Sequence, residues 1–425
     1  MKLNKKAIDF LQNVTLLLLL GSALFLITRL PIAQDIWDDH TTGLLDASVA
    51  TTNTQRPGDL SSSIGSIHLV ATGDKEYGRF SQLYLDPETP VFSELIPLFR
   101  EALGSAVDSG SVADSVLQGA LDYPGFFLDM TSALPIQIIA AWLGESTALD
   151  LEVMALALTT EAGDNATLYL CCSDQTILQY STALPSSAIL SAMDAFSPNG
   201  GSFAFESVHS GLAPYTVLAN EISALSNMYA ALPDGYSAYN LLTALDFNAH
   251  TNSRYTERNG TEVIEESPRT LRISPDGTVN YSGDEDATSP LYLVSHTGET
   301  ASAAETLLSG IELASALTAG TDAGALFLYA QTETDDGWHL AFHYELNGIP
   351  VLLSGGKPAL SITIRNNVII AFTYCCRSFT ASEESAPLLP PAMAAAIAAE
   401  GSGTDLSLGY IDTDPDLLAA QWLNG

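Results

Sequence analysis

The chain of 425 residues carries 50 Asp or Glu against 15 Lys or Arg, which gives a formal net charge of −35. Its hydrophobic fraction of 47% is enough for folded cores, so a wholly disordered acidic chain is excluded. Nucleic-acid binding and attachment to anionic lipid both need a basic surface, so the charge argues against both functions.

Residues 14–32 form an apolar run, which predicts one transmembrane helix. Lys2, Lys5 and Lys6 precede this run, so the positive-inside rule places segment 1–13 in the cytoplasm and the bulk of the chain outside the cell membrane. The alternative is a signal peptide cleaved after Ala33, for which Pro31 is a poor residue at the −3 position. Without its first 29 residues the chain has 11 basic and 49 acidic side chains, so the extracytoplasmic part carries −38.

Segment 33–63 is polar and reads as a linker, after which an N-terminal extracytoplasmic domain is predicted over 64–235. Its expected strands are at 64–71, 80–85 and 203–208, with a hairpin formed by 167–172 and 176–181. Helices are expected over 93–103, capped by Ser93, over 114–121, and from Ser187 onward.

A central hairpin-rich domain is predicted over 236–300, where Asn259-Gly260 and Pro275-Asp276-Gly277 are turn signals between strand-like runs. A C-terminal domain, 301–425, follows, with helices expected at 304–314 and 392–399 and strands at 326–331, 339–346, 362–365, 368–373 and 406–411. Hairpin blocks with single helices predict an α+β fold, in which antiparallel hairpins and meanders are covered by helices in two to three subdomains.

No motif in the chain specifies catalysis or a cofactor. His339 and His343 have the spacing of helical zinc ligands, but the alternation predicts a strand, on whose wetter face they lie about 13 Å apart. The Asp412, Asp414, Asp416 series lacks the glycine that a calcium loop needs at its sixth position. We therefore expect no metal, no cofactor and no enzymatic activity; a wall hydrolase is disfavoured because no nucleophile motif is present.

Two vicinal cysteine pairs are the least ordinary feature of the sequence. Cys171-Cys172 and Cys375-Cys376 each fall at the end of a predicted strand, so one thiol of each pair points to a core and the other away from it. A disulfide between the pairs would require neighbouring strands; otherwise the four are free thiols. Both alternatives stay open at this point.

Several sequence segments resemble those of the YycH family, the extracytoplasmic regulators associated with the WalK-type sensor histidine kinase of Gram-positive bacteria. They are the anchor sequence LLLLLGSALFLITRL at 16–30, the segment YTERNGTEVIEESPRTLRISPDGTVNY at 255–281, HYELNGIPVL at 343–352, and the closing 408–422 with Tyr410 and Trp422. The resemblance spans most of the chain in order, and the N-terminal third matches less distinctly. The family has no catalytic residues to transfer to this sequence.

The resemblance implies a non-enzymatic regulator that contacts a sensor histidine kinase and a sister regulatory protein through its transmembrane helix and outer domains. Gly21, Ser22 and Ala23 form a small-residue patch in the predicted anchor that would allow close helix approach, or they merely interrupt a leucine run. The alternative function is an extracytoplasmic sensor that binds cell-envelope components in a cleft between the two halves. Such a cleft would draw on the aromatic residues Tyr215, Tyr229, Tyr236, Tyr239 and Trp338.

Overall fold

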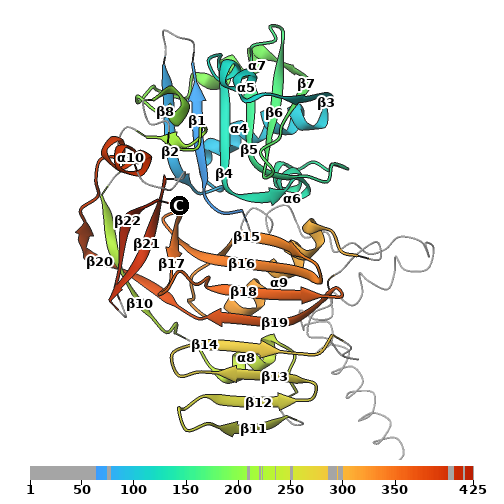
Figure 1. The fold of residues 1–425 in the computed structure, drawn as a ribbon, viewed down its shortest axis with the longest axis vertical. Coiled ribbons are helices and arrows are strands. Elements are labelled where there is room, and N and C mark those ends of the chain that lie inside the picture. Colours follow the sequence, from blue (N-terminus) through green and yellow to red (C-terminus); the bar gives the residue numbers. More distant parts are fainter. Residues whose placement is uncertain are drawn as a thin grey trace, which may run out of the picture. The chain divides into compact units, whose positions relative to one another are not determined.

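The computed structural model shows two large β-sheets with helices packed on them (Figure 1). It describes residues 64–73, 78–207, 211–219, 222, 224–234, 236–248, 252–285, 294, 300–400, 406–414 and 417–424. All of these residues belong to one unit, Arg56–Gly425. The predicted mixed α+β class, dominated by antiparallel strands, is confirmed.

The first sheet has seven strands among the described residues, in the order β2-β1-β4-β5-β6-β7-β3, and every neighbouring pair is antiparallel. The predicted hairpin is present as β6 and β7. The strands are β1 (Ile67–Thr72), β2 (Arg79–Leu85), β3 (Val107–Val112), β4 (Gly125–Pro135), β5 (Glu152–Thr159), β6 (Asn165–Cys172) and β7 (Ile177–Pro185).

Helices cover both faces of this sheet. On one face lie α4 (Pro90–Gly104), α6 (Ile136–Leu143) and α7 (Ser186–Met193), whose apolar side chains join the main core. The strands before α6 and α7 both end in Ala-Leu-Pro, and the proline has a φ of −55° or −65° where the helix starts, which suits a helix entry. On the other face, α5 (Asp114–Ala120) packs with the short pair β8 (Ser202–Phe203) and β9 (Val217–Leu218) in a smaller core.

The second sheet has thirteen strands within the described ranges, and β17–β21 is its one parallel pair there. One arm runs β15-β16-β18-β19-β14-β13-β12-β11, and a second arm, β17-β21-β22-β10-β20, joins at the end of β16. The strands are β10 (Leu225–Ala231), β11 (Ser253–Thr256), β12 (Glu262–Glu266), β13 (Arg269–Ile273), β14 (Thr278–Ser282), β15 (Leu326–Thr334), β16 (Gly337–Leu346), β17 (Ile349–Leu352), β18 (Leu360–Arg365), β19 (Val368–Cys375), β20 (Ser378–Ala386), β21 (Leu406–Asp414) and β22 (Leu417–Asn424).

In the described ranges, the helices beside the second sheet are α8 (Ala238–Ala244), α9 (Ala303–Thr318) and α10 (Pro391–Glu400). The helix α9 begins with a capping box, in which Ser302 accepts from the Glu305 N–H and the Glu305 carboxylate accepts from the Ser302 N–H. Its buried side chains pack on β15, β16 and β18. The predicted meander at Asn259-Gly260 and Pro275-Asp276-Gly277 is confirmed as β11 to β14.

Two local predictions were wrong, and one strand was not predicted. The helix expected to be capped by Ser93 begins at Pro90, because a proline at the first helical position already suits the start. The strand expected at 203–208 is only β8 followed by a 3-10 turn over Ala204–Glu206. The strand β22 was missed because its sequence does not alternate; pairing with β21 supplies its backbone partners.

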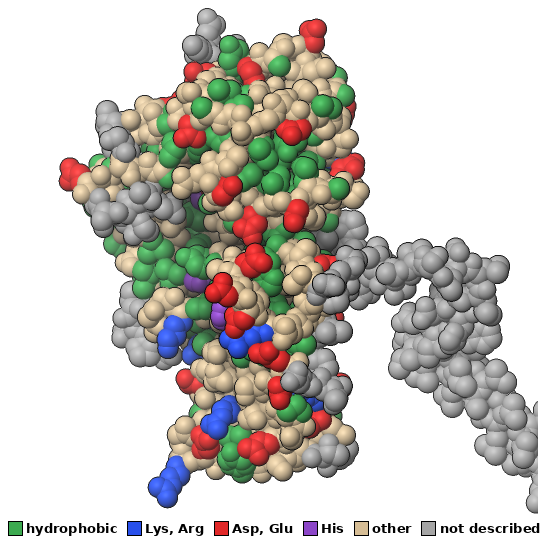
Figure 2. Space-filling view, turned by 45° about the vertical axis from the view of Figure 1, so that its right-hand side comes forward, with side chains coloured by type: hydrophobic (Ala, Val, Ile, Leu, Met, Phe, Trp, Pro, Cys, Tyr) green, Lys and Arg blue, Asp and Glu red, His purple; other side chains and the backbone are tan. Residues whose placement is uncertain are grey.

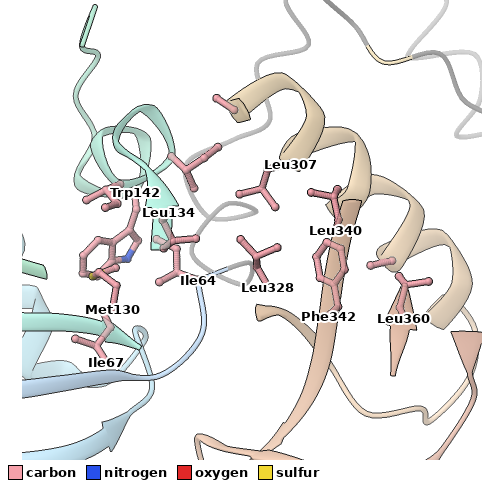
Figure 3. Packing of buried hydrophobic residues seen from close by; sticks show 14 of the residues in the cluster. Ile64, Ile67, Met130, Leu134, Trp142, Leu307, Leu328, Leu340, Phe342 and Leu360 are labelled. Carbon is pink, nitrogen blue, oxygen red and sulfur yellow. The ribbon is translucent and has the colours of Figure 1, made fainter. Parts of the chain in front are cut away.

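The two sheets share one hydrophobic core, which crosses the predicted domain boundaries. Ile64 and Leu134 of the first sheet's side lie beside Leu328 of the second sheet's side (Figure 3), and all three belong to the same core. The sheet itself also crosses the predicted boundary at residue 300, since β14 pairs with β19, and the boundary at residue 235, since β10 pairs with β20.

The predicted cytoplasmic segment 1–13, the anchor 14–32 with Gly21, Ser22 and Ala23, and the linker 33–63 lie outside the described residues. Among the helices of the described ranges, none is long and apolar enough to cross a membrane.

Candidate functional site

A cavity of about 630 Å³ lies between the two sheets. Its walls come from β1, β2, β4 and β5 on one side and from β15, β16, β17, β21 and β22 on the other. A neighbouring cavity of about 450 Å³ is lined in part by the same residues: Asp129, Met154, Ala213 and Thr216. Cavities of this size are typical of small-molecule binding sites.

The first wall carries a histidine–carboxylate pair. The register of β1 and β4 places His68 directly opposite Asp129, and His68 Nδ1–H donates to Asp129 Oδ2 at 3.0 Å. The other carboxylate oxygen, Oδ1, accepts from the Thr131 N–H at 3.0 Å. In the neutral imidazole this tautomer leaves a lone pair on Nε2, a buried atom that has no hydrogen-bond partner among the described residues.

Two residues with positive φ flank this pair. Tyr84 has a φ of 56° and Thr131 a φ of 59°, a region that non-glycine residues occupy rarely and a β-branched residue almost never. The Tyr84 ring meets the His68 ring edge-on at 4.7 Å, and Thr131 Oγ1 donates to the Ser66 carbonyl at 3.1 Å. Strained backbone of this kind clusters at functional sites, where the surrounding structure holds it in place.

The second wall carries His343 on β16. Its ring lies 4.1 Å from the Tyr329 ring, centroid to centroid, at a tilt of 32°, and its Nδ1–H donates to the Val351 carbonyl at 3.1 Å. Burial lowers the pKa of His343 to about 4, so the ring is neutral and its Nε2 is a hydrogen-bond acceptor. We predicted that the β16 face carrying His339 and His343 is the wetter one. At His343 this was wrong: the residue is 3% exposed, because it lines the cavity opposite the first sheet.

Glu345, two residues along the same strand, completes this wall. Both of its carboxylate oxygens accept from the Ser66 N–H, at 3.0 and 3.3 Å. Burial raises the pKa of Glu345 to about 8, and the charge of Asp86 adds to the rise, so the carboxyl is protonated at neutral pH. Gly65 leaves room for this contact, since a Cβ there would lie 2.5 Å from Glu345 Oε1.

The four cysteines lie elsewhere and are free thiols. Cys171 and Cys172 are in β6, between β5 and β7, and they line the smaller cavity. Cys375 ends β19, which lies between β14 and β18, and Cys376 follows it. Burial raises the pKa of Cys171 to about 12, so this thiol is an unreactive one.

The aromatic residues named from the sequence do not line the larger cavity. Tyr215 lines the smaller one, whereas Tyr229 and Tyr239 are exposed. The rings beside the larger cavity belong to Tyr84, Phe327 and Tyr329 instead. Within the part of the chain that the structure describes, no group of three His, Cys, Asp or Glu residues could hold a metal ion.

Sequence reasoning missed His68, Asp129 and Glu345. His68 is embedded in the apolar run Ile67–Thr72 and has no local signal, because its partner Asp129 is 61 residues away. His343 and Glu345 did carry a signal, since their alternation put them on one face of a strand.

The cavity is thus lined by His68, whose Nε2 has no partner among the described residues, by the neutral His343 ring and by the neutral Glu345 carboxyl. No protein-family model matches the chain, and comparison with curated proteins and with solved structures found no significant match to either.

Proposed function

We propose that the described part of this chain is a non-enzymatic binding module that takes a small ligand into the cavity between its two sheets. The observation that carries this proposal is His68, which lines the cavity, is oriented by Asp129, and has a buried Nε2 with no hydrogen-bond partner among the described residues. A buried polar atom without a partner costs free energy, and a ligand that hydrogen-bonds to it recovers that cost.

Binding is favoured over nucleophilic catalysis by the surroundings of the same atom. A catalytic imidazole of the serine or cysteine type needs a hydroxyl or thiol within hydrogen-bonding reach of its free nitrogen. None of the described residues has such a group at His68 Nε2. The raised pKa of Cys171 also argues against the nearby thiol as a nucleophile.

Met154→Trp is expected to abolish ligand binding, because Met154 lines both cavities and a larger ring there fills the space. The side chain is 41% exposed, so the change is compatible with folding. A fragment library screened by ligand-observed NMR measures binding. The matched control is Met393→Trp on α10, which is 54% exposed and away from the cavity. Equal fragment binding by both variants and the original protein would refute the binding module.

A second proposal comes from the sequence resemblance: the chain regulates a sensor histidine kinase, contacting the kinase through its transmembrane helix and its outer domains, together with a sister protein. The resemblance, the predicted orientation with a cytoplasmic N-terminus and the Gly21–Ala23 patch support this function. Ligand binding outside the membrane and kinase contact within it are compatible in one protein.

The kinase proposal predicts that Gly21→Leu together with Ala23→Leu reduces co-purification of the histidine kinase from solubilised membranes by about tenfold, because larger side chains block close helix approach. Leu17→Ala with Leu19→Ala, outside the patch, is the control. Removal of residues 1–30 should have the same effect as the patch variant. Undiminished recovery of the kinase with the patch variant contradicts the proposed contact.

A further inference from the structure

The cavity also limits the chemistry of what it binds, and this inference rests on the proposed binding function. We propose that its ligand is an uncharged, hydroxyl-bearing ring, such as a neutral sugar unit. Three properties of the walls lead to this class. The described lining residues include no Lys or Arg, two imidazoles (that of His68 with an Nε2 that has no partner) lie with a protonated carboxyl, and aromatic rings line the wall.

An anionic ligand has no partner in this cavity. The described lining residues include no Lys or Arg, the side chains that recognise carboxylate and phosphate groups. The sequence has no Lys or Arg at all between Arg100 and Arg254, which covers β3 to β10. Acidic side chains are spread over the face in Figure 2, whereas its few basic ones lie in the lower half. The resulting field repels anions before they reach the cavity.

A cationic ligand is disfavoured by the state of the two carboxyl groups. Asp129 already has both oxygens hydrogen-bonded, by His68 and by Thr131. Glu345 is protonated at neutral pH because it is buried, so a cation bound there would first have to displace its proton. Asp129 is thus already engaged by two donors, and Glu345 carries no charge at neutral pH.

Hydroxyl groups match the remaining hydrogen-bonding capacity. His68 Nε2 and His343 Nε2 are acceptors when their rings are neutral, since each Nδ1–H is already used. The protonated Glu345 carboxyl is a donor. A hydroxyl donates and accepts, so a polyol can satisfy both kinds of group at once, which an apolar molecule cannot.

Aromatic rings at the wall suit the flat apolar face of a sugar ring. Tyr329 is 55% exposed and its ring lies beside His343, while Phe327 and Tyr84 contribute further ring surface to the same cavity. Aromatic side chains supply large contact areas with specific geometry. The combination of rings with hydrogen-bonding groups and no fixed cation favours a neutral sugar over a lipid or a phosphate ester.

The first test compares three probes that share one ring and differ in charge: N-acetylglucosamine, glucosamine and glucuronic acid. Saturation-transfer NMR at about pH 6.5, where the glucosamine amine is charged, measures binding to the whole protein. We expect N-acetylglucosamine to bind at least about tenfold more tightly than either charged probe, and Met154→Trp to abolish its binding. Tighter binding of a charged probe overturns the inference. If fragments from the library bind but none of the three sugars does, the sugar inference is overturned, while the proposed binding module stands.

The second test uses the proton on Glu345. The ionisable groups around this carboxyl are Asp86, His343 and, across the cavity, His68 and Asp129. Binding is measured above pH 7, where His343 is already neutral and does not change its charge. Affinity for N-acetylglucosamine should fall about tenfold per pH unit above about pH 8, because the donor proton is lost. Glu345→Gln keeps a donor and should give a flat profile. Glu384→Gln, on exposed β20, should behave like the original protein. Affinity that rises with pH indicates a cationic ligand and overturns the inference.

Discussion

Replacing Glu345 by glutamine is expected to stabilise the protein by about 3 kcal/mol at pH 7 and to change its stability little near pH 4. The carboxyl has a pKa of about 8 in the folded protein against an ordinary 4.5, so folding favours the proton-bound form. The folded state therefore loses stability as pH rises above 4.5, and the loss is complete above about pH 8. Glutamine accepts from the Ser66 N–H without this ionisation.

Urea unfolding of both proteins from about pH 4 to about pH 9 measures the effect as the difference between their free energies of unfolding. Taking the difference removes the pH-dependent contributions of the other titrating groups, including His343, because both proteins share them. The conservative control is Glu384→Gln on the exposed strand β20, for which we expect no pH-dependent difference. A Glu345→Gln protein that is less stable at pH 7 would show that the ionised carboxylate is held favourably, contrary to the raised pKa.

Gly348→Ala is expected to destabilise the protein by several kcal/mol, on the order of 2 kcal/mol more than the same change at Gly355. Gly348 follows Asn347 in the two-residue turn between β16 and β17, and both residues have positive φ, 54° and 76°. A Cβ at Gly348 would lie 2.6 Å from the Tyr84 carbonyl oxygen and 3.0 Å from Ser66 Cβ, so the turn meets the first sheet. The substitution should therefore loosen the contact between the sheets as well as strain the turn.

Gly355→Ala separates these two causes. Gly355 has a φ of 81°, close to that of Gly348, but a Cβ there meets nothing within 4 Å. The Gly355→Ala variant should lose about 1 kcal/mol of its free energy of unfolding, from backbone strain alone. Thermal or urea unfolding compares the two variants, and the binding assay with N-acetylglucosamine reports whether the cavity changes. If Gly348→Ala and Gly355→Ala lose the same stability, the close approach of Gly348 to Tyr84 does not contribute to the stability of the protein.

Local structure was predictable where its cause is local. The turns Asn259-Gly260 and Pro275-Asp276-Gly277 lie between β-strands as expected, since their residues adopt positive φ or pre-set a turn. The helix α9 was likewise predicted from its apolar spacing. By contrast, β22 depends on pairing with β21, and its own residues do not determine that it is a strand.

The candidate site was beyond sequence reasoning because its residues meet only in the tertiary structure. His68 and Asp129 come together through the register of β1 and β4, and Glu345 meets Ser66 across 279 residues. The sequence did place His343 and Glu345 on one face of a strand, but it assigned that face to solvent. Alternation distinguishes the two faces of a strand; it does not tell whether a second sheet covers the polar one.

By itself, the sequence of this protein determined its charge of −35, the helices α4, α5, α7, α9 and α10, several hairpins and the α+β class, whereas α6 and α8 were not predicted. These follow from side-chain periodicity and turn chemistry, which act over a few residues. Only the tertiary structure decided that the two sheets share one core and enclose a cavity lined by the buried His68 and His343 and the half-buried Glu345. The protonation state of these groups is set by burial between distant segments, and no local pattern records it.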